Sequence, residues 1–221
     1  MDWYYYLILV LLFGIVITII GFFIYNIKNA KKLHHRRVHK KLLALANDRD
    51  YYSLCNVNLK TELSTNVHIN DLLIGDKFVY VISARYYEDN LVGNDFYDEY
   101  FSVTAKDGTF IRRVKNPIIM NEKRTVILSK FLGCDGKSPM FYSIVVVNNN
   151  VDVITDQNNL QEYSKICKKK DVAALIKKIE KEANITPFDD QQLAKVVSRL
   201  HALSLEQNRL EQSKNNPEGD E

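Results

Sequence analysis

The sequence has few of the residues that stabilise folds by covalent or metal cross-links. Its 221 residues include only three cysteines, Cys55, Cys134 and Cys167. Their number is odd, their spacing is wide, and no CxxC or mixed Cys/His pattern occurs, so we expect neither a disulfide framework nor a structural zinc site. Reduced thiols are typical of cytosolic proteins. The cysteines therefore indicate a cytosolic location for the part of the chain that carries them.

Glycine-dependent motifs are also missing. The eight glycines occur singly along the chain. There is no glycine-rich loop of the kind that holds nucleotide phosphates, and no G-x-S-x-G elbow. The sequence therefore lacks the signatures of P-loop nucleotide-binding proteins and of α/β-hydrolases.

Charged residues are absent between Trp3 and Ile27, where Leu, Ile, Val, Phe and Tyr dominate. About 20 such residues cross the hydrocarbon core of a bilayer as a helix, the form that satisfies backbone groups there. Aromatic residues at both ends, Trp3 to Tyr6 and Tyr25, are typical of the two interfaces. We expect residues 1–27 to be a transmembrane anchor, and a buried core helix is the alternative.

The residues around this segment predict its orientation. No basic residue precedes it and no A-x-A pattern directly follows it, which argues against a cleaved secretory signal. Residues 28–41 contain seven Lys and Arg residues, and such an excess marks the cytoplasmic side of a membrane. We expect a single-pass protein of the plasma membrane with its N-terminus outside, a basic juxtamembrane segment at 28–41 that contacts lipid, and a cytoplasmic domain.

The net charge divides unevenly along the chain. It is +3 for the whole sequence, and the seven cations together with Asp2 give residues 1–41 a charge of +6, which leaves −3 for residues 42–221. Non-specific nucleic-acid binding depends mainly on neutralising phosphates. Nucleic acid is therefore a weakly supported partner of the domain, and a protein is a further candidate.

Residues 42–212 have the length of one domain. The basic segment is predicted to continue as a helix to about Asn47. Runs rich in β-branched and aromatic residues follow, and we expect an antiparallel meander from them. The runs are Tyr51–Leu59, Val67–Ile74, Lys77–Tyr87, Tyr100–Ala105 and Thr109–Val114.

The second half alternates helices and strands. Asn116-Pro117 opens a predicted helix that ends near Leu132, before Gly133. Phe141–Val147 is almost wholly apolar, as expected of a central strand covered on both faces, with Val151–Ile154 as a shorter partner. The pattern predicts an α/β (α+β) fold with a mixed central sheet and flanking helices.

Two further helices are predicted near the C-terminus. The first spans about Asp171–Ala183, and the second begins at Pro187 or Phe188, after a Thr186-Pro187 start signal, and ends near Leu210. Residues 213–221 contain no large apolar side chain. We expect them to be a disordered tail.

Short motifs follow one another in a fixed order between His68 and Val147. They are Ile69–Ile74, Val79–Arg85, Leu91–Gly93, Tyr100-Phe101 and Asn116–Asn121. Their order and spacing resemble the nuclease-related domain (NERD) family, a branch of the restriction-endonuclease-like PD-(D/E)xK fold. The resemblance implies that fold for residues 42–212, and an N-terminal membrane helix is compatible with it.

The resemblance also implies where catalysis would lie. Chemistry in that fold needs an Asp and a Glu on adjacent strands to hold a divalent ion, and a Lys two residues after the Glu. This sequence has Asn70, Ser83 and Arg85 at these positions, which supply no anionic ligand and no base. We therefore expect no catalytic residue, bound metal or cofactor here. Ser83 and Arg85 would instead line a pocket for an anion or a partner's carboxylate.

Two functional hypotheses remain. The first is a membrane-anchored binding or scaffold module whose nuclease-like fold no longer cleaves. The alternative is a Mg²⁺-dependent DNA nuclease with relocated carboxylates, in which Asp71 becomes the metal ligand after a one-residue slip and Glu62, Glu88 or Asp89 replaces the missing Glu. Such a slip would turn Asp71 toward the opposite face of the sheet.

Overall fold

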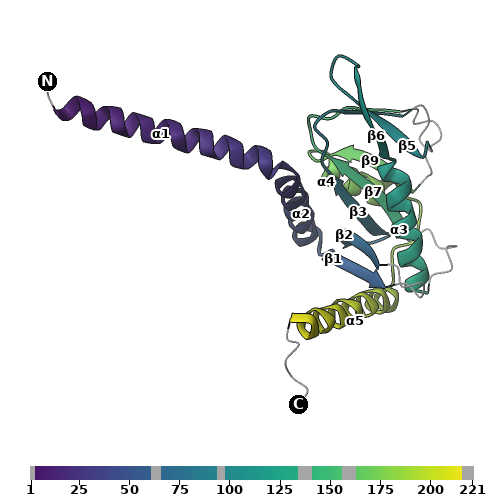
Figure 1. Ribbon diagram of the computed structural model, residues 1–221. Helices are drawn as coiled ribbons and strands as arrows, with labels where there is room; N and C mark the ends of the chain where they lie inside the picture. The colour runs from purple at the N-terminus through teal and green to yellow at the C-terminus, as the bar shows by residue number, and fades with distance from the viewer. Residues whose placement is uncertain (1–2, 61–65, 94–97, 134–140, 156–162, 216–221) are drawn as a thin grey trace.

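The computed structural model describes residues 3–60, 66–93, 98–133, 141–155 and 163–215 and has a mixed α+β fold (Figure 1). Helix α1 (Trp3–Lys28) extends away from the rest of the chain, and α2 (Ala30–Arg49) turns back onto the sheet. They meet at Asn29, whose side-chain amide donates to the Tyr25 carbonyl at 3.0 Å. Within the described residues, none of the helices has both the length and the apolar character needed to cross a membrane.

The larger sheet has the strand order β1-β2-β3-β7-β9. Strands β1, β2 and β3 are antiparallel neighbours, whereas β3, β7 and β9 run parallel. Their bounds are β1 Tyr52–Lys60, β2 Asn66–Ile74, β3 Val79–Arg85, β7 Phe141–Val147 and β9 Ser164–Lys168. Every residue of β7 is buried, so the prediction of a central strand covered on both faces is confirmed.

A second sheet has the order β6-β5-β4-β8. Its strands are β4 Asn90–Val92, β5 Tyr100–Thr104, β6 Phe110–Lys115 and β8 Val153–Ile154. The predicted meander is therefore correct for β1–β3 and for the antiparallel pair β5–β6, but wrong in placing β5 beside β3, because β5 pairs with β4 in the second sheet. Strand β8 also pairs with β4 rather than with β7. Strands β4 and β9 were not expected. Alternation along a strand shows which side chains share a face, but it does not identify the neighbouring strand.

Three helices complete the described fold: α3 (Pro117–Phe131), α4 (Val172–Glu182) and α5 (Asp190–Asn215). Helix α3 begins as expected, because Asn116 Oδ1 accepts from the Ile118 amide at 2.9 Å, and Gly133 follows it with a φ of +68°.

The predicted start of the last helix is wrong. Asp189 and Gln192 cap α5 reciprocally, with the Gln192 amide donating to Asp189 Oδ1 at 2.7 Å and the Asp189 amide donating to Gln192 Oε1 at 3.2 Å. The helix continues to Asn215, so residues 213–215 of the expected tail belong to it, and 216–221 lie outside the described residues.

The two faces of the larger sheet have different cores. Helices α2 and α4 cover one face through Val38, Leu42 and Ile176, and α3 and α5 cover the other through Leu128 and Leu200. Burying a side chain of this size contributes about 1.5–3 kcal/mol to folding. Because one helix, α2, contains both the basic segment and these buried residues, the basic segment is joined rigidly to the domain.

His34 gives α2 a polar contact inside this core. It is 3% exposed and contacts the Val146 carbonyl through Nε2 at 3.2 Å. Burial lowers the pKa of His34 to about 4, although the bond to Val146 acts in the opposite direction. The neutral form is therefore the one compatible with the fold.

This pKa predicts a pH dependence of folding. An unfolded His34 takes up a proton below about pH 6.5 and the folded one only below about pH 4, so the free energy of unfolding should fall as the pH drops through this window, by up to about 3 kcal/mol. Urea unfolding at several pH values measures the slope, which His34→Leu should reduce. The exposed control His201→Leu should keep the wild-type slope, and equal slopes in all three proteins would contradict the assignment.

Candidate functional site

The structure brings together Asn70, in the middle of β2, and Ser83, near the end of β3. Because Asp71 pairs with Ile82 in the antiparallel register, Asn70 and Ser83 are opposite one another, and Ser83 Oγ lies 3.5 Å from Asn70 Oδ1. Arg85 is two residues further along β3 and so projects from the same face. The three positions that the family resemblance singles out thus share one face of the sheet, the face covered by α3.

Cations rather than anions surround these positions. Burial and then Arg85 lower the pKa of Arg124 on α3. Burial, and then the charges of Arg124 and Arg85, lower the pKa of His68. The charge of Asp71 acts in the opposite direction. One buried nitrogen of each guanidinium, Nε of Arg85 and Nη1 of Arg124, has no hydrogen-bond partner among the described residues. The site is therefore electropositive and has unused donors.

Asp71 lies on the opposite face and contacts α2. Its Oδ1 is 2.7 Å from Nδ1 of His39, and the residue is 4% exposed. Burial raises the pKa of Asp71, and the bond to His39 opposes that effect only in part. The carboxylate that the alternative hypothesis needs thus lies between the sheet and α2 and does not face Ser83.

The residues present do not fit the divalent ion that this fold implies. Hard cations prefer several carboxylate or carbonyl oxygens, whereas the face of Asn70 and Ser83 offers neutral oxygens beside two guanidinium groups. Glu62 is outside the described residues, Glu88 is exposed beside Arg85, and Asp89 lies in the segment before β4. No group of three or more His, Cys, Asp or Glu side chains that could hold a metal occurs in the described part of the chain.

Asn121 fixes α3 over the centre of the larger sheet. The residue is fully buried, and its amide donates to the Val81 carbonyl at 2.8 Å and to Ser143 Oγ at 2.9 Å. It thereby bridges β3 and β7. Asn121 belongs to the sequence motif that opens α3, but the site residues Arg124 and His68 were not predicted. The one available signal was helical spacing, which places Arg124 one turn after Asn121.

Arg85 also lines a cavity of about 380 Å³ beside the joint between α1 and α2. Ser83 does not line it, so the two predicted binding residues share a face of the sheet but not this cavity. The other lining residues come from both helices, from the segment after β3 and from β6: Lys28, Ala30, Lys31, His35, Tyr86, Tyr87, Glu88 and Arg112. We call this cavity the collar pocket.

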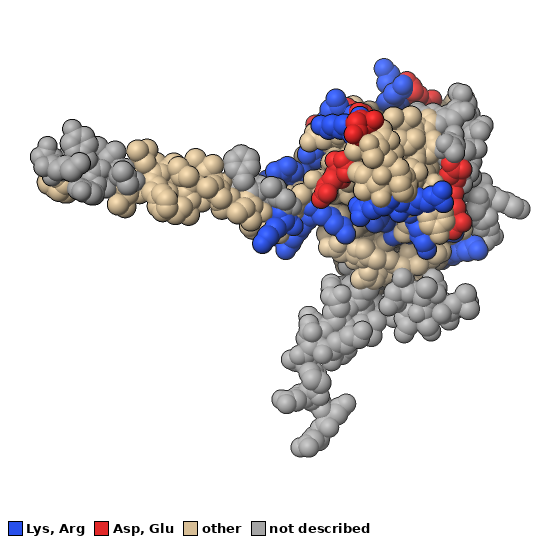
Figure 2. Space-filling view, turned by 45° about the horizontal axis from the view of Figure 1, so that its top comes forward, with Lys and Arg blue, Asp and Glu red and all other residues tan. Residues whose placement is uncertain are grey.

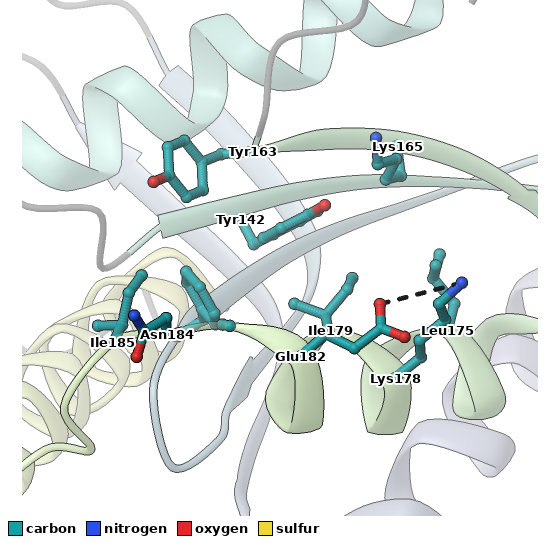
Figure 3. Close-up of a pocket in the computed structure, with 11 residues that line it drawn as sticks. Tyr142, Tyr163, Lys165, Leu175, Lys178, Ile179, Glu182, Asn184 and Ile185 are labelled. Atoms are coloured by element: carbon teal, nitrogen blue, oxygen red, sulfur yellow. Dashed lines mark ion pairs between the residues drawn. The ribbon is translucent and has the colours of Figure 1, made fainter.

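A larger hollow of about 590 Å³ lies between α4 and the sheet (Figure 3). Phe78, Tyr142 and Tyr163 form its aromatic wall, and Lys178 and Glu182 form an ion pair of 3.9 Å on α4. These aromatics lie just before or at the start of β3, β7 and β9. Ligands of open α/β sheets usually bind at the carboxyl ends of the parallel strands, where Arg85 and the collar pocket are found.

Comparison with known proteins gives a family match. The model of the family described as nuclease-related domain (NERD) matches residues 30–148, which include α2 and β1 in addition to the motifs in the sequence. A crystal structure of a protein of unknown function, AF1548, is similar over 74% of this chain and 78% of its own, with 9% identity and a TM-score of 0.33. No curated protein matches the sequence.

The position of Asp71 predicts how its removal acts. Because burial raises the pKa of this carboxyl, ionising it costs folding free energy, and that cost is absent at low pH and present once the pH exceeds the folded pKa. Asp71→Asn, which keeps an acceptor for His39, should therefore gain stability relative to the wild type as the pH rises from about 3 to 7. Thermal unfolding measures this difference. The exposed control Asp50→Asn should show none, and a loss of several degrees in Asp71→Asn at pH 7 would contradict the assignment.

Proposed function

Because the chain belongs to the nuclease-related domain family, we propose that it is a membrane-anchored binding module whose nuclease-related fold does not cleave nucleic acid. One observation supports the loss of cleavage above all. Asn70, Ser83 and Arg85, which the family resemblance aligns with the metal-binding and activating residues, share one face of the sheet, and Arg85 and Arg124 make their surroundings positive.

This arrangement favours an anionic ligand over a metal ion. A carboxylate or phosphate accepts paired bonds from a guanidinium group, and Arg85 and Arg124 have buried nitrogens without partners among the described residues. We infer that the face carrying Ser83 and Arg85 binds an acidic group of a partner protein, with no cofactor. The net charge of −3 on residues 42–221 makes nucleic acid the less favoured partner.

The geometry of α1 supports the membrane anchor. The helix has 26 residues, which at 1.5 Å per residue is about 39 Å and exceeds the hydrocarbon thickness of about 30 Å. Each described large apolar side chain between Val10 and Tyr25 is at least 49% exposed. An apolar surface of this extent is stable against lipid or another protein, not against water.

No helix meets the requirements for a membrane span within the described residues, and the uncharged run of the sequence also includes residues 4–9, whose side chains lie outside them. With Lys and Arg gathered where α1 meets the domain (Figure 2), the positive-inside rule favours a plasma-membrane protein with its N-terminus outside and its domain in the cytoplasm.

The loss of cleavage has a direct test. The purified full chain in detergent should leave supercoiled and linear DNA intact in Mg²⁺ or Mn²⁺. The triple variant Asn70→Asp, Ser83→Glu, Arg85→Lys restores the two carboxylates at adjacent positions, and calorimetry should show Mn²⁺ binding at least about tenfold tighter than in the wild type, or about 1.4 kcal/mol. Wild-type cleavage that a chelator and Asp71→Ala both abolish would establish the relocated-carboxylate nuclease instead.

The anchor predicts a fractionation result. Membranes from cells that express the full chain should retain it after alkaline carbonate extraction. Val16→Arg with Ile17→Arg should release it, because each charge at the centre of a membrane helix costs about 2.5–3.5 kcal/mol. The control Val16→Leu with Ile17→Leu should stay in the membrane. Release of the wild-type chain by carbonate would refute the anchor.

A further inference from the structure

The collar pocket lies where the proposed membrane helix joins the domain. Lys28 is the last residue of α1, and Lys31 is in the first turn of α2. Arg85 ends β3, and Arg112 comes from β6 of the second sheet. Four cations from four separate elements therefore converge on one cavity.

These cations exceed the anions available to them. Glu88 is the one carboxylate among the lining residues, and none of the four cations forms an ion pair with a carboxylate of the described residues. The positive charge of these cations also changes the pKa values of two neighbouring side chains, His35 and Tyr87. Burial is the largest cause of the lowered pKa of His35, and the charges of Arg85 and Lys31 are the next largest. Burial raises the pKa of Tyr87, and the charges of Arg85 and Arg112 act in the opposite direction.

The wall of the pocket is held in place by the core. The Tyr87 amide donates to Asn148 Oδ1 at 2.9 Å, and the ring of Tyr86 lies 6.1 Å from that of buried His34. Both tyrosines follow β3 directly. A pocket whose wall is fixed before binding loses less conformational entropy when a ligand enters.

The depth of the pocket relative to α1 identifies the ligand. The uncharged run of the sequence ends at Ile27, so if α1 spans the bilayer, Lys28 and the pocket beside it lie at the level of the lipid headgroups. Arg and Lys are the side chains that bind phosphate oxygens, and basic pockets beside membrane helices bind anionic headgroups. Figure 2 shows the basic side chains gathered around the base of α1.

We propose that the collar pocket binds the phosphate of an anionic phospholipid, with Arg85 and Arg112 on one side and Lys28 and Lys31 on the other. That the bound phosphate belongs to a lipid rests on the proposed membrane anchor. That the pocket binds phosphate at all depends on the pocket alone. About 380 Å³ is within the range of small-molecule sites, which are about 300–1,000 Å³. Bound lipid would fix the angle between α1 and the domain, and so orient the domain on the membrane.

The chain offers a matched pair of variants for the test. Lys31→Gln with Arg112→Gln removes two pocket cations. Lys32→Gln with Arg113→Gln removes two exposed cations from adjacent positions of the same helix and strand, and Arg113 lines a different hollow with Asp98 and Glu99. Both doubles change the net charge equally, so diffuse attraction to an anionic surface falls by the same amount in each.

The experiment is a calorimetric titration, in which short-chain phosphatidic acid is added to the full chain in neutral detergent micelles. The wild type and the Lys32/Arg113 double should bind alike, and the Lys31/Arg112 double at least about tenfold more weakly, or about 1.4 kcal/mol. Equal affinity of the two doubles would overturn the pocket. If the Lys31/Arg112 double melts below the wild type without ligand, the single variants Arg112→Gln and Arg113→Gln replace the doubles.

Two further titrations distinguish a lipid phosphate from free phosphate and from the phosphates of nucleic acid. Inorganic phosphate should bind more weakly than the lipid, and equal affinity would assign the pocket to free phosphate and overturn the lipid proposal. A short DNA duplex that displaces the lipid from the wild type, but binds the Lys31/Arg112 double weakly, would assign the pocket to nucleic acid. Micelles do not require α1 to span a bilayer, so a failed carbonate extraction and a failed titration remain distinguishable.

Discussion

The parallel pairing of β3 with β7 is the constraint on which the rest of the fold depends. Its register, from Val79 opposite Phe141 to Arg85 opposite Val147, requires a long connection, which holds α3 and strands β4, β5 and β6 of the second sheet. Asn121 then joins α3 to both strands through Val81 and Ser143. With α3 on one face, α2 and α4 complete the other. The carboxyl end of β3, where Arg85 projects, is thereby brought beside the joint between α1 and α2.

Strand alternation decides the chemistry at this end of the sheet. Asn70 and Asp71 are neighbours in sequence, yet one faces Ser83 and the other contacts His39 on α2. A carboxylate that is one residue out of register cannot replace a missing ligand without turning the whole strand. The positive charge of Arg85 and Arg124 then favours an anion where the related nuclease chemistry would need a cation. The proposed loss of cleavage and the proposed anion site would thus both follow from the residues at these positions.

Helix α2 connects the basic segment at residues 28–41 with the core of the domain. Its basic residues face solvent and the collar pocket, while His34, Val38 and Leu42 are buried against the sheet. The family match from residue 30 agrees with this, because α2 is covered by it. A basic segment that is rigidly attached to the domain can orient the domain at a membrane surface, which a flexible linker could not do. Anchor, pocket and domain therefore form one proposed device for holding this fold at a fixed angle.

The sequence by itself determined the local features of this protein. The uncharged run before Lys28, the buried pattern of Phe141–Val147 and the Asn116-Pro117 helix start are set by neighbouring residues, and periodicity and local motifs reveal them. The positions Asn70, Ser83 and Arg85 follow from the resemblance to the family. Tertiary structure decided which strands pair, so β8 joined β4 and β9 extended the larger sheet. It also brought Arg124 and His68 to the site, and Arg112 to the collar pocket, from distant parts of the chain. Pairing and convergence depend on burial and backbone hydrogen bonds between segments far apart in sequence, which no local pattern records.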